Sequence, residues 1–160
     1  MQHTHQNINR AEAPAWGATS PYFTLRELTA SATAERQGID NTPTTAARHM
    51  LAILVERLLH PIRLAWQAPI IVTSGYRCPE LNEEVCGVED SYHMEGCAVD
   101  ISAIAPDEET RRLRNVELMS LIRAMHLTGK LALTECYLGY KAKYIHVAYK
   151  RDAIDPYPFF

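Results

Sequence analysis

The order of helix-forming and strand-forming segments constrains the fold of this chain more than any other feature of its sequence. Between Thr44 and Trp66, apolar residues recur at close to helical spacing, which predicts the main core helix. The β-branched run 70–73 then predicts a short buried strand. Further elements are expected as strands at 97–102, 131–138 and 144–149, and as one charged helix from Pro106 to about His126. Because strands and helices do not alternate regularly, the pattern favours an α+β fold over a doubly wound parallel sheet.

Local signals predict where the helices begin, bend and end. Thr24 and Glu27 form a capping box before an Ala-rich segment that is expected to be helical to about Arg36, with Gly38 ending it. Pro61 lacks a backbone N–H and clashes with the preceding turn, so a kink or break is expected there.

Length and composition indicate one globular domain. A chain of 160 residues with 47% apolar and 22% charged residues is large enough to bury its own core. Residues 1–21 are polar and without periodicity, which predicts an N-terminal tail. The main domain is therefore expected at 22–152, with a C-terminal tail at 153–160.

Charge and hydropathy exclude several classes of partner. A net charge of -3 gives no field that would gather phosphates, so nucleic acid is not an expected partner. No stretch approaches 18 consecutive apolar residues, so no membrane span is expected. The N-terminus lacks the pattern of a signal peptide, which predicts a cytoplasmic protein or one released by lysis or a non-classical route. The oligomeric state is not predicted.

The four cysteines, Cys78, Cys86, Cys97 and Cys136, form no C-x-x-C pair, which argues against a zinc ribbon or a thioredoxin-like site. Without a signal peptide, buried free thiols are expected rather than disulfides. If one disulfide exists, Cys78 and Cys86 are the expected pair.

Two predicted strands carry polar residues on faces that small neighbours leave open. Because side chains alternate along a strand, Val99 and Ile101 face the core and Asp100 faces the other way. His146 likewise lies between Tyr144 and Ala148 on one face of the last strand. Glu135 shares its predicted face with Leu131, Leu133 and Tyr137, so its charge needs a partner.

Together with His93, these residues form the donor set of a zinc enzyme. Two histidines and one carboxylate, His93, Asp100 and His146, leave the fourth position of a tetrahedral zinc open to water, which is typical of a catalytic site. Glu135 is the expected general base. A single Zn²⁺ per chain is predicted.

The other histidines and the cysteines give weaker support for a metal-binding or catalytic role. His49, His60 and His126 are expected to be surface or hydrogen-bonded residues, and His3 and His5 lie in the tail. The H-x-E of a zinc deaminase occurs at His93-Met94-Glu95, but its P-C-x-x-C partner is absent. Cys97 and Cys136 lie in no motif that supports a nucleophilic cysteine.

Three ordered motifs carry a resemblance to a known family. These are Ser74-Gly75-Tyr76-Arg77 with Leu81-Asn82, the pattern S-x-H-x-x-G-x-A-x-D from Ser91 to Asp100, and Glu135 followed by His146-Val147-Ala148. From about Tyr22 to Tyr149, the sequence resembles the zinc D-alanyl-D-alanine carboxypeptidase family of murein peptidases, whose fold is shared with the hedgehog signalling domain.

This resemblance implies a fold, a site and a substrate. The fold would be a small, mainly antiparallel sheet that carries the zinc site and packs against helices. His93, Asp100 and His146 would be the zinc ligands and Glu135 the catalytic base. Arg77 would bind substrate or stabilise the developing oxyanion, and Ser91 would help to orient the substrate.

Two functions from different classes follow from the resemblance. The first is a zinc peptidase that hydrolyses D-alanine-containing peptidoglycan peptides as a carboxypeptidase, dipeptidase or endopeptidase. The alternative is a catalytically inactive, zinc-containing module that binds the cell wall.

Overall fold

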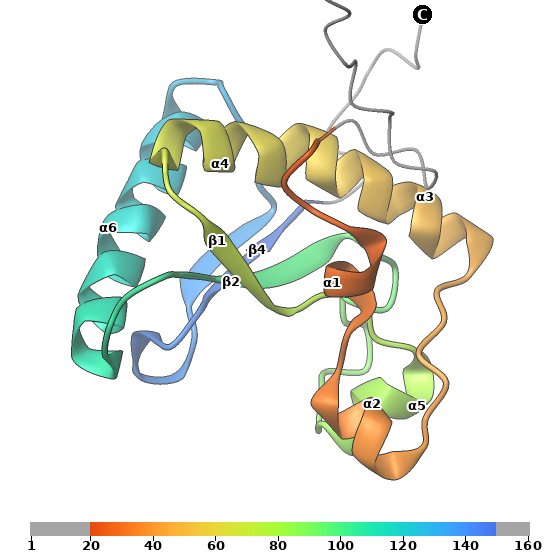
Figure 1. Ribbon diagram of the computed structural model, residues 1–160. Helices are drawn as coiled ribbons and strands as arrows, with labels where there is room; N and C mark the ends of the chain where they lie inside the picture. The colour runs from red at the N-terminus through yellow and green to blue at the C-terminus, as the bar shows by residue number, and fades with distance from the viewer. Residues whose placement is uncertain (1–19, 150–160) are drawn as a thin grey trace, which may run out of the picture.

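The computed structural model describes residues 20–149 (Figure 1). The predicted tails, 1–21 and 153–160, lie outside this range except for Ser20 and Pro21. Within residues 20–149, four strands form one antiparallel sheet in the order β1-β2-β4-β3. Their bounds are β1 (Ile70–Ser74), β2 (Ala98–Ala103), β3 (Glu135–Leu138) and β4 (Ile145–Ala148). The α+β prediction with an antiparallel sheet is confirmed.

The third predicted strand is shorter than expected. Residues 131–134 are not part of β3, because the chain there still wraps around the end of the preceding helix. Lys130 N and Leu131 N both donate to Met125 O, and His126 Nδ1 lies 3.1 Å from Leu131 O. Leu131 is buried in the core and Leu133 packs against it, although neither residue belongs to β3.

Two short helices replace the single one predicted near the N-terminus. Helix α1 (Leu25–Thr29) has the expected capping box, and α2 (Ala32–Gln37) ends at Gly38 in the left-handed conformation. Between them Ser31 adopts an extended conformation and accepts a hydrogen bond from Ala34 N, as an N-cap serine does. The cap residue therefore starts a new helix where the Ala-rich composition predicted continuity.

The irregularity predicted at Pro61 is present just before it. Helix α3 (Thr45–Leu54) continues through a π-helical turn, η1 (Val55–Leu59), into α4 (His60–Trp66). A wider turn at this point accommodates a residue that cannot donate an internal hydrogen bond.

Two further helices flank the sequence of β2. Helix α6 (Glu108–Leu127), capped by Asp107, matches the predicted charged helix. Helix α5 (Pro79–Glu84) was not predicted, because six residues are too few to show a helical period. A short 3-10 turn, η2 (Tyr140–Ala142), joins β3 to β4. No helix within residues 20–149 is long and apolar enough to cross a membrane.

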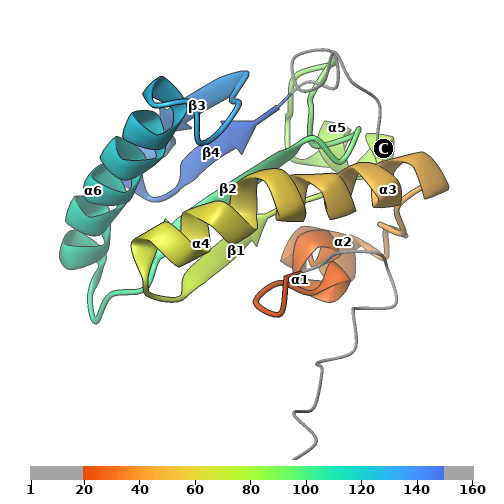
Figure 2. The same ribbon diagram turned by 90° about the horizontal axis from the view of Figure 1, so that it is seen from above.

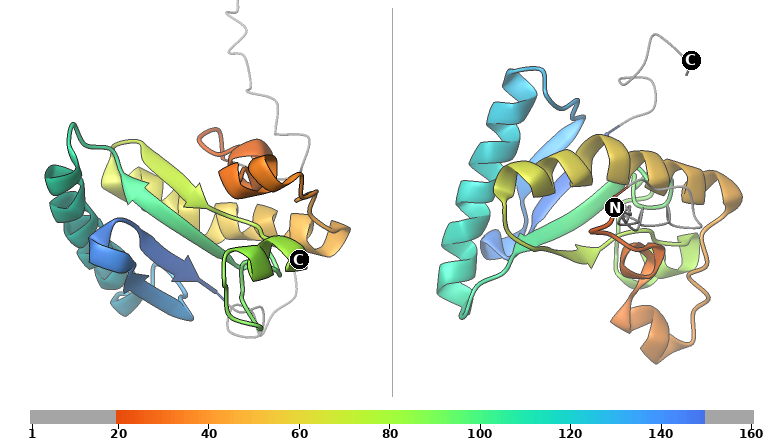
Figure 3. Two further views of the ribbon diagram at one scale, coloured as in Figure 1. Left: turned by 90° about the horizontal axis from the view of Figure 1, so that it is seen from below. Right: turned by 45° about the horizontal axis from the view of Figure 1, so that its top comes forward.

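Helices α3, α4 and α6 cover one face of the sheet (Figures 2 and 3). Val99, Ile101, Ile145 and Val147 are fully buried in the core that these helices form with the sheet. Since side chains alternate, Asp100 on β2 and His146 on β4 point to the opposite face. That face carries the candidate site.

Candidate metal centre

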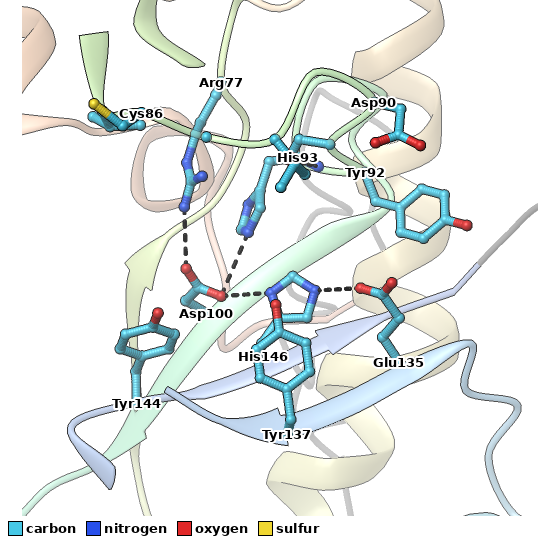
Figure 4. A pocket seen from close by; sticks show the side chains of 14 residues that line it. Arg77, Cys86, Asp90, Tyr92, His93, Asp100, Glu135, Tyr137, Tyr144 and His146 are labelled. Atoms are coloured by element: carbon cyan, nitrogen blue, oxygen red, sulfur yellow. Dashed lines mark hydrogen bonds and ion pairs between the residues drawn. The ribbon is translucent and has the colours of Figure 1, made fainter. Parts of the chain in front are cut away.

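His93, Asp100 and His146 converge although they are far apart in sequence (Figure 4). Asp100 and His146 are directly opposite each other in the β2–β4 pair, and His93 belongs to the loop that precedes β2. All three are buried, with at most 5% of each residue exposed. One potential ligand atom from each lies within 4.8 Å of the others. The predicted donor set is therefore assembled in one place.

The His93 loop is fixed by a close approach to helix α3. Gly96 has φ +74°, and a Cβ at this position would lie 2.4 Å from Ala47 O. Only glycine fits both the conformation and the contact. Ser91 Oγ accepts a hydrogen bond from His93 N at 3.3 Å, so Ser91 stabilises the turn that carries the histidine.

Contacts outside the group fix the tautomer of His93. Its Nδ1 lies 2.7 Å from Gly75 O, and Arg77 N donates in turn to His93 O. Because a carbonyl oxygen can only accept, Nδ1 carries the proton and Nε2 keeps its lone pair. Nε2 lies 3.4 Å from Asp100 Oδ1, so the lone pair faces the other candidate ligands.

His146 lies between two carboxylates. Its Nδ1 is 2.8 Å from Asp100 Oδ1, and its Nε2 is 3.0 Å from Glu135 Oε2. The Tyr137 ring stacks on the imidazole, with ring centroids 4.6 Å apart and planes tilted by 19°. A ligating histidine commonly donates its second ring N–H to a carboxylate, which orients the first nitrogen toward the metal.

Asp100 is ionised and oriented by its neighbours. Burial raises the pKa of this carboxyl, but in the metal-free protein the imidazoles of His146 and His93, which donate to the carboxylate when they are protonated, outweigh burial and hold the pKa at about 2. Arg77 Nη2 donates to Oδ2 at 3.2 Å, while Arg77 Nε is held by Ser74 Oγ at 3.1 Å. With Oδ2 engaged by the guanidinium, Oδ1 is the oxygen that faces both imidazoles.

The chemistry of this donor set fits a divalent cation. Each of the three residues presents one atom inward, namely His93 Nε2, Asp100 Oδ1 and His146 Nδ1, and each is held by a contact on its other side. The carboxylates of Asp100 and Glu135 and the guanidinium of Arg77 together leave one negative charge when the imidazoles are neutral. A divalent cation bound by nitrogen and oxygen ligands would offset the buried carboxylate.

The group lies at the base of a cavity of about 410 Å³ whose lining includes the remaining predicted site residues, Arg77, Ser91 and Glu135. Glu135 does not lie in the apolar environment expected from sequence. Its side chain is 41% exposed, and Leu131 and Leu133 are not in its strand. The carboxylate is thus accessible from the cavity while one oxygen contacts His146.

Two tyrosines of the cavity lining and one backbone carbonyl beside it have no role predicted from the sequence. Tyr137 and Tyr144 line the cavity beside the proposed ligands, and the carbonyl of Gly75 contacts His93. Tyr144 could have been found, since it precedes His146 by two residues on one face of the strand predicted at 144–149. A backbone carbonyl gives no such signal in sequence.

Within residues 20–149, the other histidines and the cysteines are not part of this group, and His3 and His5 lie outside the described residues. His60 Nδ1 contacts Ser20 Oγ at 2.9 Å, and His126 contacts the backbone near Leu131, which confirms their interpretation as hydrogen-bonded residues. Cys78 and Cys136 are free thiols with limited exposure. Cys86 is also free but exposed, contrary to the expectation of burial, because it lies at the cavity rim after α5.

An α+β fold with a buried His, Asp, His group and a separate carboxylate beside it defines a candidate metal-dependent hydrolase. The family comparison agrees with this class. The sequence model described as Peptidase M15 matches residues 21–148, and the chain belongs to this family of metallopeptidases. A comparison with curated proteins gives no match.

Proposed function

We propose that the protein is a zinc-dependent peptidase that hydrolyses peptide bonds in D-alanine-containing peptidoglycan peptides. The observation that carries this proposal is the convergence of His93, Asp100 and His146 with Glu135 Oε2 3.0 Å from His146 Nε2, in a chain of the Peptidase M15 family. The murein substrate rests on the resemblance of the three sequence motifs to D-alanyl-D-alanine carboxypeptidases.

Zinc suits the donor set better than the hard cations. Two imidazole nitrogens and one carboxylate oxygen are typical of catalytic zinc, whereas calcium and magnesium favour oxygen ligands alone. The residues that would hold zinc are His93 through Nε2, Asp100 through Oδ1 and His146 through Nδ1. When bound, zinc supplies Lewis-acid polarisation of the scissile carbonyl and makes water a stronger acid at neutral pH.

Glu135 would move the protons of the reaction. Its Oε2 accepts from His146 Nε2, which leaves Oε1 to take a proton from the attacking water and pass it to the leaving amine. Partial exposure toward the cavity lets a substrate approach this oxygen.

Arg77 would place positive charge beside the substrate. Its Nη2 and Nε are engaged by Asp100 and Ser74, and within residues 20–149 no protein atom accepts from Nη1. The guanidinium can therefore hold Asp100 and also donate to a carbonyl or carboxylate oxygen of the peptide. Ser91, whose Oγ already accepts from His93 N, would use its own hydroxyl hydrogen to orient the substrate.

The test is incubation of zinc-loaded protein with defined muropeptides, with the products identified by mass. We expect about one zinc per chain, loss of a D-alanine-linked fragment, and a kcat about 10²–10⁴-fold lower in Glu135→Gln. Absence of zinc after purification and reconstitution would contradict the metal assignment. Binding of zinc and peptide without any hydrolysis would instead identify the inactive cell-wall-binding module.

A further inference from the structure

Tyr144 lies in the proposed catalytic cavity and has no role so far in the proposed hydrolysis. It lines the cavity together with Arg77, Asp100, Glu135 and His146, and it is half-buried. Its hydroxyl makes no hydrogen bond to any protein atom within residues 20–149. A phenol held at the wall of a cavity with an open donor is suited to a ligand oxygen.

The position of the Tyr144 ring is fixed by Gly139. A Cβ built on Gly139 would lie 2.1 Å from Cζ of Tyr144 and 2.3 Å from Cε2, so the ring packs directly on the glycine backbone. Gly139 N also donates to Tyr144 O at 2.9 Å. Any larger residue at position 139 would push the ring out of its place.

The turn between Gly139 and Tyr144 is itself held in an unfavourable conformation. Lys141 and Ala142 have φ values of 52° and 55°, in the left-handed region that side chains other than glycine rarely adopt. The buried amide of Asn115 donates to Ala142 O at 2.9 Å, and Lys143 Nζ lies 3.4 Å from Glu108 Oε1. Such conformations persist where the surroundings impose them, so the turn is a rigid support for Tyr144.

The hydroxyl of Tyr144 is turned toward the proposed ligands in the cavity. In Figure 4 the ring lies below Asp100 with its hydroxyl turned toward the carboxylate, and Arg77 reaches the same carboxylate from the other side. Glu135 lies across His146 from Tyr144. The proton-transfer group and this open donor therefore occupy opposite sides of the proposed ligands.

We propose that Tyr144 is a substrate-binding residue whose hydroxyl donates a hydrogen bond to a peptide oxygen beside Arg77. This inference rests on the proposed function and deepens it. A guanidinium and a phenol together match either the terminal carboxylate of a peptide or a carbonyl oxygen within a longer chain. The first acceptor implies a carboxypeptidase and the second an endopeptidase.

The test compares Tyr144→Phe with Tyr140→Phe. Phenylalanine keeps the ring on Gly139 and removes only the hydroxyl, and Tyr140 is a matched control because it lies in the same turn, is 70% exposed and does not line the cavity. Each variant is assayed on a peptide ending in D-alanyl-D-alanine and on its C-terminal amide. Peptide binding is measured separately by calorimetry in the Glu135→Gln background, with zinc content and Tm as further readouts.

We expect Tyr144→Phe to lower kcat/KM and peptide affinity about 10-fold, with zinc content unchanged and Tyr140→Phe like the wild type. A loss confined to the free acid assigns the hydroxyl to the terminal carboxylate, and an equal loss on both peptides assigns it to a carbonyl. Changes below twofold on both peptides, an equal loss in Tyr140→Phe, or a loss of zinc would overturn the inference. If the wild type binds the peptide without cleaving it, the proposed function fails while the binding data still decide the role of Tyr144. If it does neither, both proposals fail.

Discussion

Two buried polar clusters lie two residues apart on β2, and only one of them has the chemistry of a site. Asp100 is surrounded by two imidazoles and a guanidinium. Ser102, two residues further along β2, contacts Asn115, which is completely buried on α6. Asn115 accepts from Ala103 N at 2.8 Å and donates to Ala142 O at 2.9 Å. Asp100 and Asn115 are both buried, with 5% and 0% of the residue exposed.

The difference between them lies in how their donors and acceptors are matched. In the Asn115 cluster neutral groups satisfy one another, so it is complete without a ligand and holds the turn after β3 in place. In the Asp100 cluster a charged oxygen and two nitrogen lone pairs point at one another, which is favourable only when a proton or a cation lies between them. Burial alone therefore does not distinguish a site from a structural contact.

Replacing the charged Asp100 by a neutral amide like that of Asn115 has the largest expected effect. Asp100→Asn removes the charge but keeps the shape, so we expect loss of stoichiometric zinc and activity lower by about 10³-fold, since a Lewis-acid metal contributes several kcal/mol. The measurement is metal content together with peptide hydrolysis. Asp90→Asn, at an exposed acid of the same cavity, should keep its zinc. Full zinc occupancy in Asp100→Asn would contradict the ligand assignment.

The reciprocal change, which gives Asn115 a carboxylate, should lower the stability of the fold rather than affect metal binding. Asn115→Asp replaces two donors by an acceptor that faces Ala142 O in a fully buried position, so we expect a loss of about 3 kcal/mol or more in the free energy of unfolding. Chemical denaturation measures it, with Gln67→Glu as an exposed control. An unchanged denaturation midpoint would mean that this cluster does not hold the fold.

In the metal-free protein, lowering the pH should remove the stability that the Asp100 cluster contributes, whereas the neutral Asn115 cluster does not titrate. The folded pKa of Asp100, about 2, lies below its ordinary value of 3.8, so the unfolded state binds the proton first. The carboxylate therefore contributes about 2 kcal/mol of stability above pH 4, which is lost as the pH falls to about 2. Unfolding curves with chelator should show this loss in the wild type and not in Asp100→Asn. Parallel pH profiles of stability for the wild type and Asp100→Asn would contradict this prediction.

The smallest expected effect connects the two clusters through the turn that Asn115 holds. Gly139→Ala should displace the Tyr144 ring and lower kcat/KM about 10-fold, without loss of zinc, because the contact lies outside the proposed ligands. Gly129→Ala is the control, since a Cβ there meets nothing within 4 Å and should change stability alone. Equal kcat/KM in the two variants would mean that the turn at Gly139 has no effect on the site.

Much of the fold was legible from local signals. The capping box at Thr24, the helix start expected at Pro106 and the β-branched run of β1 all predicted elements that are present. The failures occurred where the chain continued to wrap around the end of a helix, and where an element was too short to show a period. Leu131 turns around α6 rather than joining β3, and α5 is only six residues long.

The sequence by itself determined which residues could bind a metal and which strand faces carry them, because alternation along a strand is a local property of the backbone. It did not determine what holds those residues. The carbonyl of Gly75 on His93, Glu135 on His146 and the packing of Gly139 against Tyr144 join segments that only the folded chain brings together. Such contacts depend on distances between elements, and these are set by how the sheet and helices pack rather than by the order of residues.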